Sequence, residues 1–306
     1  MSEGAIRRIG FVGIGNMGWP MAANLLKAGF AVTVADAVPG RARDFAREVG
    51  GQAAAGAAEA AAEADAVITI LPTSQHVAAV VEEMLESLPA GAVVIEMSSG
   101  VPGVTRQLAE RLAAKGCAMA DCPVSGGVPR ARTGELAIMA GGEAAVLDRI
   151  GPVLAAVGTS VHRCGGIGNA QAMKALNNLV SAGGFLIGIE ALLIGQKFGL
   201  DPALMVDVLN SSTGMNNSTQ KKFKQFVLSR RFDSGFGLDL MVKDLSIALE
   251  VGRETGTPTP FAALCREMWA SAGALLGPGQ DHTAVAQLAE QLGGQALGGG
   301  NGGSQK

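Results

Sequence analysis

Short apolar runs alternate with stretches of helical periodicity over the first part of the chain, up to about residue 163. Alternation of this kind is typical of a doubly wound, mostly parallel sheet with helices on both faces. The predicted strands are 7–14, 31–36, 66–71, 92–97, 118–121 and 136–140, with a weaker candidate at 160–163. The clearest predicted helices are 20–27, 53–64 and 104–115.

Beyond Gly168 the strand pattern stops, and the segment 169–198 predicts one long, nearly uninterrupted apolar helix. Its polar residues share one face, because they are spaced as i, i+3, i+4 and i+7. They are Lys174, Asn177, Asn178 and Ser181. An ammonium group and two amides are costly to bury without partners. The stripe therefore either faces water or serves a chemical purpose.

The first predicted strand ends in a glycine-rich turn, Gly13-Ile14-Gly15-Asn16-Met17-Gly18, which a helix, a second strand and Asp36 follow. This order is typical of a dinucleotide-binding βαβ unit. Gly13 permits the tight turn, Gly15 lets a pyrophosphate approach the backbone, and Gly18 lets the helix pack on the strand. The helix N-terminus offers the phosphates free N–H groups and a partial positive charge.

Asp36 predicts NAD as the cofactor, because its carboxylate would accept hydrogen bonds from the ribose hydroxyls and repel a 2′-phosphate. NADP stays open, since Arg41 and Arg43 follow and would reach a phosphate if the loop folded back. Ligands of such sheets bind beyond the carboxyl ends of the strands. The other residues at those ends are Leu71, Pro72, Thr73, Ser98, Ser99 and the segment 122–127.

The pattern predicts an α/β N-terminal domain with a Rossmann-type doubly wound sheet (1–165), followed by an all-α C-terminal domain (166–292). The long interdomain helix joins the two domains. With 306 residues the chain is long enough for each to have its own core. Residues 293–306 are rich in glycine and are expected to form a flexible tail.

Composition and charge exclude several classes of partner. A net charge of −3 without a basic cluster argues against nucleic acid. The longest apolar run, 179–194, is interrupted by Glu190 and glycines, so we do not expect it to span a membrane. No signal-peptide pattern precedes the first strand, which favours the cytoplasm. The four cysteines show no zinc-ligand spacing, and no metal site is expected.

The chain has no tyrosine and only three histidines, His76, His162 and His282. Dehydrogenase chemistry built on a Tyr-Lys pair is therefore excluded. None of the histidines forms an obvious catalytic dyad, and a structural role is expected for each. Moving a hydride from a hydroxyl-bearing carbon requires a group that takes the hydroxyl proton. Lys174 is the best candidate for that general acid/base.

Four motifs in order resemble the β-hydroxyacid dehydrogenase family, which includes 3-hydroxyisobutyrate dehydrogenase and tartronate semialdehyde reductase. They lie at 13–25, 121–127, 165–178 and 243–245, and the resemblance covers nearly the whole chain. It implies an NAD-dependent enzyme that interconverts a small 3-hydroxy carboxylate and its semialdehyde. In the family the lysine matching Lys174 is the acid/base, and the asparagine matching Asn178 holds the substrate.

The resemblance also implies a carboxylate site at Ser125, Gly126 and Gly127, where a hydroxyl and two backbone N–H groups make a compact anion nest. Ser99 and Lys243 would lie at the nicotinamide end of the cofactor.

The substrate within the class stays open. Arg130 and Glu135 look more like the sugar-acid members, such as tartronate semialdehyde reductase or threonate dehydrogenase, whereas 218–244 looks more like 3-hydroxyisobutyrate dehydrogenase. Arg130 is thus a candidate substrate contact, with a solvent-facing arginine as the alternative. An imine reductase or a non-catalytic binding module on the same fold would lack the lysine, so Lys174 disfavours both.

Gly183, Gly184 and Gly188 weaken the long helix unless another backbone comes close to it. A helix this apolar is also costly to expose to water along its whole length. We therefore expect a homodimer or homotetramer with the helical domains in the interface.

Overall fold

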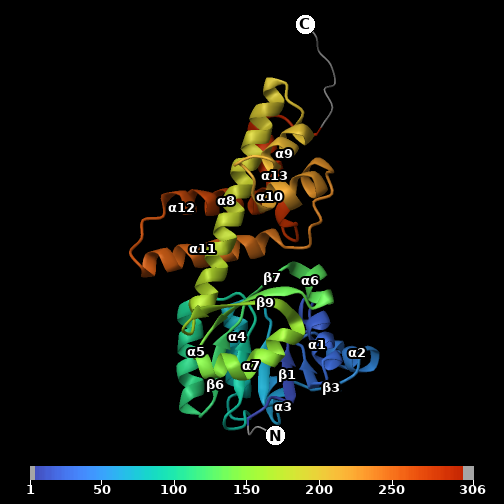
Figure 1. Ribbon diagram of the computed structural model, residues 1–306, viewed down its shortest axis with the longest axis vertical. Coiled ribbons are helices and arrows are strands. Elements are labelled where there is room, and N and C mark those ends of the chain that lie inside the picture. The colour runs from blue at the N-terminus through green and yellow to red at the C-terminus, as the bar shows by residue number, and fades with distance from the viewer. Residues whose placement is uncertain (1–3, 299–306) are drawn as a thin grey trace. The chain divides into compact units, whose positions relative to one another are not determined.

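The computed structural model describes residues 4–298. The chain divides into two compact units, Met1–Lys174 and Ala175–Lys306. The division falls inside helix α8 (Asn169–Phe198), which links the units and ends where the periodicity predicts (Figure 1). The expected N-terminal Rossmann-like sheet and the helical domain after it are confirmed.

The N-terminal unit is built on a nine-stranded sheet of order β3-β2-β1-β4-β5-β6-β8-β7, with β9 paired to β8. The strands are β1 (Arg8–Val12), β2 (Ala31–Ala35), β3 (Gln52–Ala53), β4 (Ala66–Thr69), β5 (Val93–Glu96), β6 (Ala118–Asp121), β7 (Val124–Ser125), β8 (Leu136–Gly141) and β9 (Gly158–Gly165). The first six are parallel, whereas β8 runs antiparallel to β6 and β7, so the sheet is mixed. The strand order reverses at β1, where doubly wound sheets bind their ligands.

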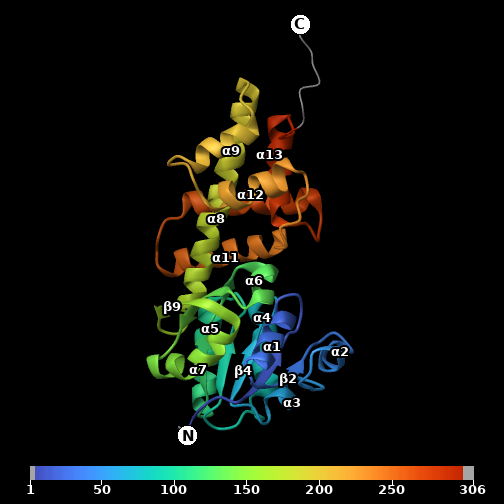
Figure 2. The same ribbon diagram turned by 45° about the vertical axis from the view of Figure 1, so that its right-hand side comes forward.

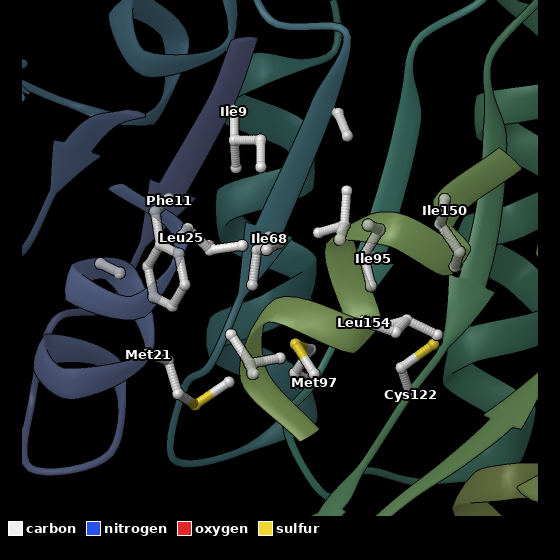
Figure 3. Packing of buried hydrophobic residues seen from close by; sticks show 14 of the residues in the cluster. Ile9, Phe11, Met21, Leu25, Ile68, Ile95, Met97, Cys122, Ile150 and Leu154 are labelled. Atoms are coloured by element: carbon white, nitrogen blue, oxygen red, sulfur yellow. The ribbon is translucent and has the colours of Figure 1, made fainter. Parts of the chain in front are cut away.

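Helices cover both faces of this sheet (Figures 1 and 2). They are α1 (Gly18–Lys27), α2 (Arg41–Glu48), α3 (Ala57–Ala61), α4 (Ser74–Met84), α5 (Pro102–Ala114), α6 (Gly127–Thr133) and α7 (Ala144–Val157). Successive strand residues point to opposite faces. Phe11 and Ile68 pack with α1 and α7 in one apolar cluster (Figure 3). Val12 and Val67 pack with α3, α4 and α5 in another.

The predicted helix at 53–64 is largely wrong. Ala53 pairs with Val34 in the sheet, and α3 has only five residues. The Glu83 side chain of α4 accepts the N–H of Ala57 at 2.7 Å and thereby caps the start of α3. Sheet pairing and this cap decide the structure here, because alanine propensity is a weak effect that tertiary contacts override. The weak candidate at 160–163 is the eight-residue strand β9.

Every element of the described C-terminal unit is helical, as predicted. The elements are the rest of α8, α9 (Pro202–Asn210), α10 (Asn217–Lys221), the π-helix η1 (Phe223–Leu228), α11 (Leu238–Glu254), α12 (Pro260–Leu276), the 3₁₀ helix η2 (His282–Val285) and α13 (Ala286–Gly293). Asp201 caps α9 by accepting the N–H groups of Ala203 and Leu204. This N-cap beside Pro202 is a strong helix start signal.

The glycines of α8 make room for side chains of the same unit. A Cβ on Gly188 would lie 2.6 Å from the Phe223 ring, and one on Gly184 would lie 3.3 Å from Asn216 Nδ2. These glycines are therefore explained within the chain. They do not by themselves indicate a second subunit, contrary to the reasoning from sequence.

By length and composition alone, α8 would suffice to cross a membrane, and no other helix in residues 4–298 would. Its most apolar window is 56% buried inside the protein. Part of the predicted tail is also packed: Leu297 is fully buried, and its N–H donates to Glu290 at 2.8 Å. Residues 299–306 lie outside the described part.

His282 lies in the core of the C-terminal unit, as its expected structural role requires. Its ring stacks on Trp269 with an interplanar angle of 13°, and its Nδ1 lies 3.0 Å from Ser234 Oγ. Burial, and secondarily the positive charge of Lys222, lowers the pKa of His282 from 6.5 to about 4, although the neighbouring Asp281 acts in the opposite direction. The folded protein therefore holds this imidazole neutral.

The depressed pKa of His282 predicts a loss of stability in acid. The unfolded chain protonates this ring below pH 6.5, whereas the folded protein protonates it only below about pH 4. The free energy of unfolding therefore falls by about 3 kcal/mol as the pH drops through this window. Urea unfolding at several pH values should show that His282→Gln loses less stability between pH 6.5 and 4.5 than the wild type. His162→Gln on exposed β9 serves as the control. Identical pH dependence in all three proteins would contradict the assignment.

Candidate active site

The glycine turn has the geometry that a dinucleotide needs. Gly13 has φ +96°, and a Cβ there would lie 2.4 Å from the carbonyl oxygen of Ile70. A Cβ on Gly18 would lie 1.9 Å from the carbonyl oxygen of Gly13. Gly15 instead faces open space, with no atom within 4 Å of its Cβ position. The turn is thus tightly packed at Gly13 and Gly18 and open at Gly15, where a pyrophosphate would approach the N-terminus of α1. The predicted cofactor residues Asn16 and Met17 lie within this turn.

Asp36 ties the loop after β2 to the glycine turn. Its Oδ2 accepts the N–H of Ile14 at 2.9 Å, and its Oδ1 accepts that of Val38 at 2.8 Å. Arg41 lies 3.3 Å from the same carboxylate, whereas Arg43 is exposed on α2. Of the two arginines that would read a 2′-phosphate, Arg41 is therefore already paired with an anion.

The topology brings the other predicted loops to the same edge, because β1, β4, β5 and β6 are parallel neighbours. Leu71 and the exposed Pro72 follow β4, and Ser98 and the half-buried Ser99 follow β5. The Leu71 N–H donates to Ser98 Oγ at 2.9 Å, which joins the two loops directly.

The predicted carboxylate site lies just beyond β6. Ser125 is half-buried in β7, while Gly126 and Gly127 have φ +132° and +67°, a region that side chains rarely adopt. A Cβ on Gly126 would lie 2.6 Å from Arg130 Cδ, so the stem of Arg130 packs on this glycine. The structure thus places Arg130 beside the predicted carboxylate site.

Lys174 is 8% exposed and stands in the second turn of α8, the last residue of the N-terminal unit. The start of this helix is held by Asp121 at the end of β6, whose carboxylate accepts the N–H groups of Gly168 and Gln171, each at 2.8 Å. Burial raises the pKa of Asp121, and these N–H groups act in the opposite direction. The reasoning from sequence missed both Asp121 and Gln171 as site residues.

In the C-terminal unit, Asn178 is 7% exposed and donates from Nδ2 to Asp244 Oδ2 at 2.5 Å. Lys243 Nζ lies 3.4 Å from Asp244 Oδ1. Asp244 therefore fixes the Asn178 amide and pairs with Lys243, a role that the sequence did not indicate. On the continuous helix, Lys174 and Asn178 are four residues apart and share one face.

A pocket of about 140 Å³ lies in the C-terminal unit between α8 and the start of α10. Its lining has amides, hydroxyls and one apolar side chain, without an ionisable group. The residues are Asn177, Val180, Ser181, Gly184, Asn216, Asn217 and Ser218. Such a lining suits an uncharged polar group.

Within residues 4–298, no cluster of three or more His, Cys, Asp or Glu side chains is arranged to hold a metal ion. His76 Nδ1 lies 2.7 Å from Thr73 Oγ1, and His162 Nε2 lies 2.8 Å from Ser160 Oγ. Both contacts are local, in keeping with the structural roles expected of these histidines.

Two family models match nearly the whole chain. The NAD-binding domain of 6-phosphogluconate dehydrogenase matches residues 8–166, and "NAD-binding of NADP-dependent 3-hydroxyisobutyrate dehydrogenase" matches 168–289. The 2-(hydroxymethyl)glutarate dehydrogenase of Eubacterium barkeri is 36% identical over 297 residues, covering 96% of this chain and 98% of that protein. The 3-hydroxyisobutyrate dehydrogenase of Pseudomonas aeruginosa is 38% identical over 271 residues, covering 85% and 90%.

Among solved structures, the 3-hydroxyisobutyrate dehydrogenase of Mycobacterium tuberculosis with L-serine has a TM-score of 0.86 and 32% identity, covering 93% of this chain and 99% of that one. The likeness therefore covers most of both units. The chain belongs to the 3-hydroxyisobutyrate dehydrogenase and β-hydroxyacid dehydrogenase family, and it is an NAD(P)-dependent oxidoreductase that acts on the CH–OH group of a hydroxyacid.

Proposed function

We propose that the protein interconverts a small 3-hydroxy carboxylate and its semialdehyde, with NAD as cofactor and Lys174 as general acid/base. The observation that carries this proposal is the buried lysine in the second turn of α8, whose first turn is tied by Asp121 to the carboxyl edge of the sheet. When bound, the nicotinamide accepts a hydride from the hydroxyl-bearing carbon or returns one to the aldehyde carbon.

In the oxidation, neutral Lys174 takes the hydroxyl proton while the carbon loses a hydride, so the O–H and C–H bonds break and the C=O double bond forms. In the reduction, the same ammonium group returns the proton to the oxygen. An amide nitrogen carries two hydrogens. Asn178 gives one to Asp244 and can donate the other to the reacting oxygen. The Ser125 hydroxyl with the N–H groups of Gly126 and Gly127 would hold the substrate carboxylate.

The compounds in the names of the relatives narrow the substrate class. 2-(Hydroxymethyl)glutarate, 3-hydroxyisobutyrate and L-serine all carry a hydroxymethyl group on the carbon that bears a carboxylate. They differ in the third substituent on that carbon. We favour 3-hydroxyisobutyrate or a close analogue, with tartronate semialdehyde reduction or another sugar-acid reaction as the second candidate, because Arg130 packs beside the carboxylate nest.

We also propose that the protein forms a homodimer or homotetramer through its C-terminal unit. Exposed apolar side chains recur along one side of α8, with Val180 77% exposed and Phe198 85% exposed. Ile187 and Ile194 lie between them, seven residues apart. A continuous apolar stripe of this kind is typical of a surface that another protein chain covers.

Removing the proposed base tests the proposed function directly. Lys174→Ala should lower kcat by about a hundred- to ten-thousand-fold, because proton transfer is lost while NAD still binds. Lys174→Arg should not restore activity, since a guanidinium stays protonated. Steady-state rates on 3-hydroxyisobutyrate with NAD, together with cofactor titration, give both quantities. Lys197→Ala, on the exposed last turn of α8, is the control. A Lys174→Ala protein that keeps a tenth of its kcat, with chemistry rate-limiting, would refute the assignment.

The cofactor preference depends on Asp36. Asp36→Asn keeps one side-chain oxygen, which can accept one of the two backbone N–H groups, and removes the negative charge, so NADP binding should improve relative to NAD. Asp36→Ala should in addition weaken NAD. Dissociation constants for both nucleotides decide this, with Asp44→Asn on α2 as the control. A wild type that already favours NADP tenfold would mean that an arginine reads the phosphate.

The choice of substrate depends on Arg130 if its guanidinium contacts the third substituent. Arg130→Ala should then lower kcat/KM about tenfold for diacid or polyhydroxylated substrates, and less for 3-hydroxyisobutyrate, because only the former accept directed hydrogen bonds from it. A substrate panel measures the ratio, with Arg132→Ala on the same helix as the control. Equal losses on every substrate would rule out this role.

A further inference from the structure

Gln171 is a buried polar residue on the first turn of α8, with 1% of its surface exposed. Its Oε1 accepts the Gly100 N–H at 2.7 Å, and its Nε2 donates to the Ser98 carbonyl oxygen at 2.8 Å. Both partners are backbone groups more than 70 residues earlier in the chain. The Gln171 amide thus forms hydrogen bonds with two backbone groups of the loop after β5, as acceptor from one and as donor to the other.

That loop is held firmly from its other side as well. The Val101 N–H donates to Ser74 Oγ at 2.8 Å. A Cβ on Gly100 would lie 2.8 Å from Ser74 Oγ and 2.9 Å from Glu96 Oε1, so the segment packs too closely there for any side chain. Ser99, the half-buried residue expected at the nicotinamide end, is carried in the middle of this clamped segment.

The backbone of Gln171 is fixed independently of its side chain, because its N–H donates to Asp121. Lys174 follows three residues later and therefore projects from the same side of α8 as Gln171. Gln171 thus connects the first turn of α8, next to the turn that bears the proposed base, to the loop expected at the reacting end of the cofactor. Both groups lie within the N-terminal unit.

We propose that Gln171 is a positioning residue for hydride transfer, which sets the distance between Lys174 and the segment Ser98–Gly100. The proposal rests on the proposed dehydrogenase function. A misplacement of about 1 Å can cost about a hundredfold in rate even when binding is retained. Without the Gln171 amide, two buried backbone groups lose their partners, and the segment would shift to satisfy them.

Gln171→Met tests this role because it keeps the length and packing of the side chain while removing both hydrogen bonds. It should lower kcat about ten- to a hundredfold, with the KM of the substrate and the Kd of NAD changed less than about threefold. The isotope effect on kcat, with deuterium on the hydroxyl-bearing carbon, should rise because hydride transfer becomes slower. In the cofactor-free protein, backbone hydrogen exchange over residues 98–101 should increase. Gln107→Met on the exposed face of α5 is the matched control.

Gly100→Ala provides a second variant in case Gln171→Met does not fold. Its methyl group would lie 2.8 Å from Ser74 Oγ and 2.9 Å from Glu96 Oε1, but at an ordinary contact distance of 3.7 Å from Gln171 Nε2. It should therefore displace the same segment while the Gln171 side chain stays in place, and so reproduce the loss of kcat and the faster exchange. Wild-type kcat with unchanged exchange at 98–101 would overturn the proposal. So would weakened NAD binding with an unchanged kcat at saturation, because Gln171 would then serve binding alone. If the wild type oxidises no hydroxyacid, the proposed function fails, while the exchange measurement still reports on the contact itself.

Discussion

The N-terminal unit depends on one buried anion. Asp121 ends a central strand and accepts two backbone N–H groups at the start of α8, both at 2.8 Å. The positive end of the helix stabilises such a carboxylate, which would otherwise be costly to bury. Gly141 leaves the space that this contact needs, since a Cβ there would lie 2.4 Å from Asp121 Oδ1. Through this contact the sheet determines where α8 begins and which way Lys174 projects.

The C-terminal unit also contains a buried carboxylate that bonds to α8, but with a different structural role. Asp244 is also a buried carboxylate, but it bonds a side chain of α8, the Asn178 amide, and pairs with Lys243. In the first unit a carboxylate fixes the helix backbone, and in the second a carboxylate orients a functional group on it. Removing either would leave buried donors without acceptors, which costs more than the net contribution of an ordinary hydrogen bond.

The sequence predicted correctly those elements whose structure depends on residues close together in the chain. The bounds of α8 follow from unbroken apolar periodicity, and the glycine turn follows from steric needs that only glycine meets. The segment 53–64 was misassigned because strand pairing and the Glu83 cap come from elsewhere in the chain. The roles of Gln171 and Asp244 were missed for the same reason, since their partners are 71 and 66 residues away. A single sequence shows the chemistry of each side chain, but not which distant residues it will contact in the folded protein.

The continuity of α8 through Lys174 and Asn178 has a consequence for how this protein can change. A helix advances 1.5 Å and turns about 100° per residue, so these two residues are about 6 Å apart along the helix axis. One residue inserted or deleted between them would rotate Asn178 to another side of the helix, and no loop is present there to absorb the error. A substitution at Lys174 or Asn178 can change activity by a small or a large amount, whereas an insertion or deletion between them always misplaces one of the two side chains. Divergence in substrate choice is thereby directed to the surrounding loops, and this stretch of helix keeps its length.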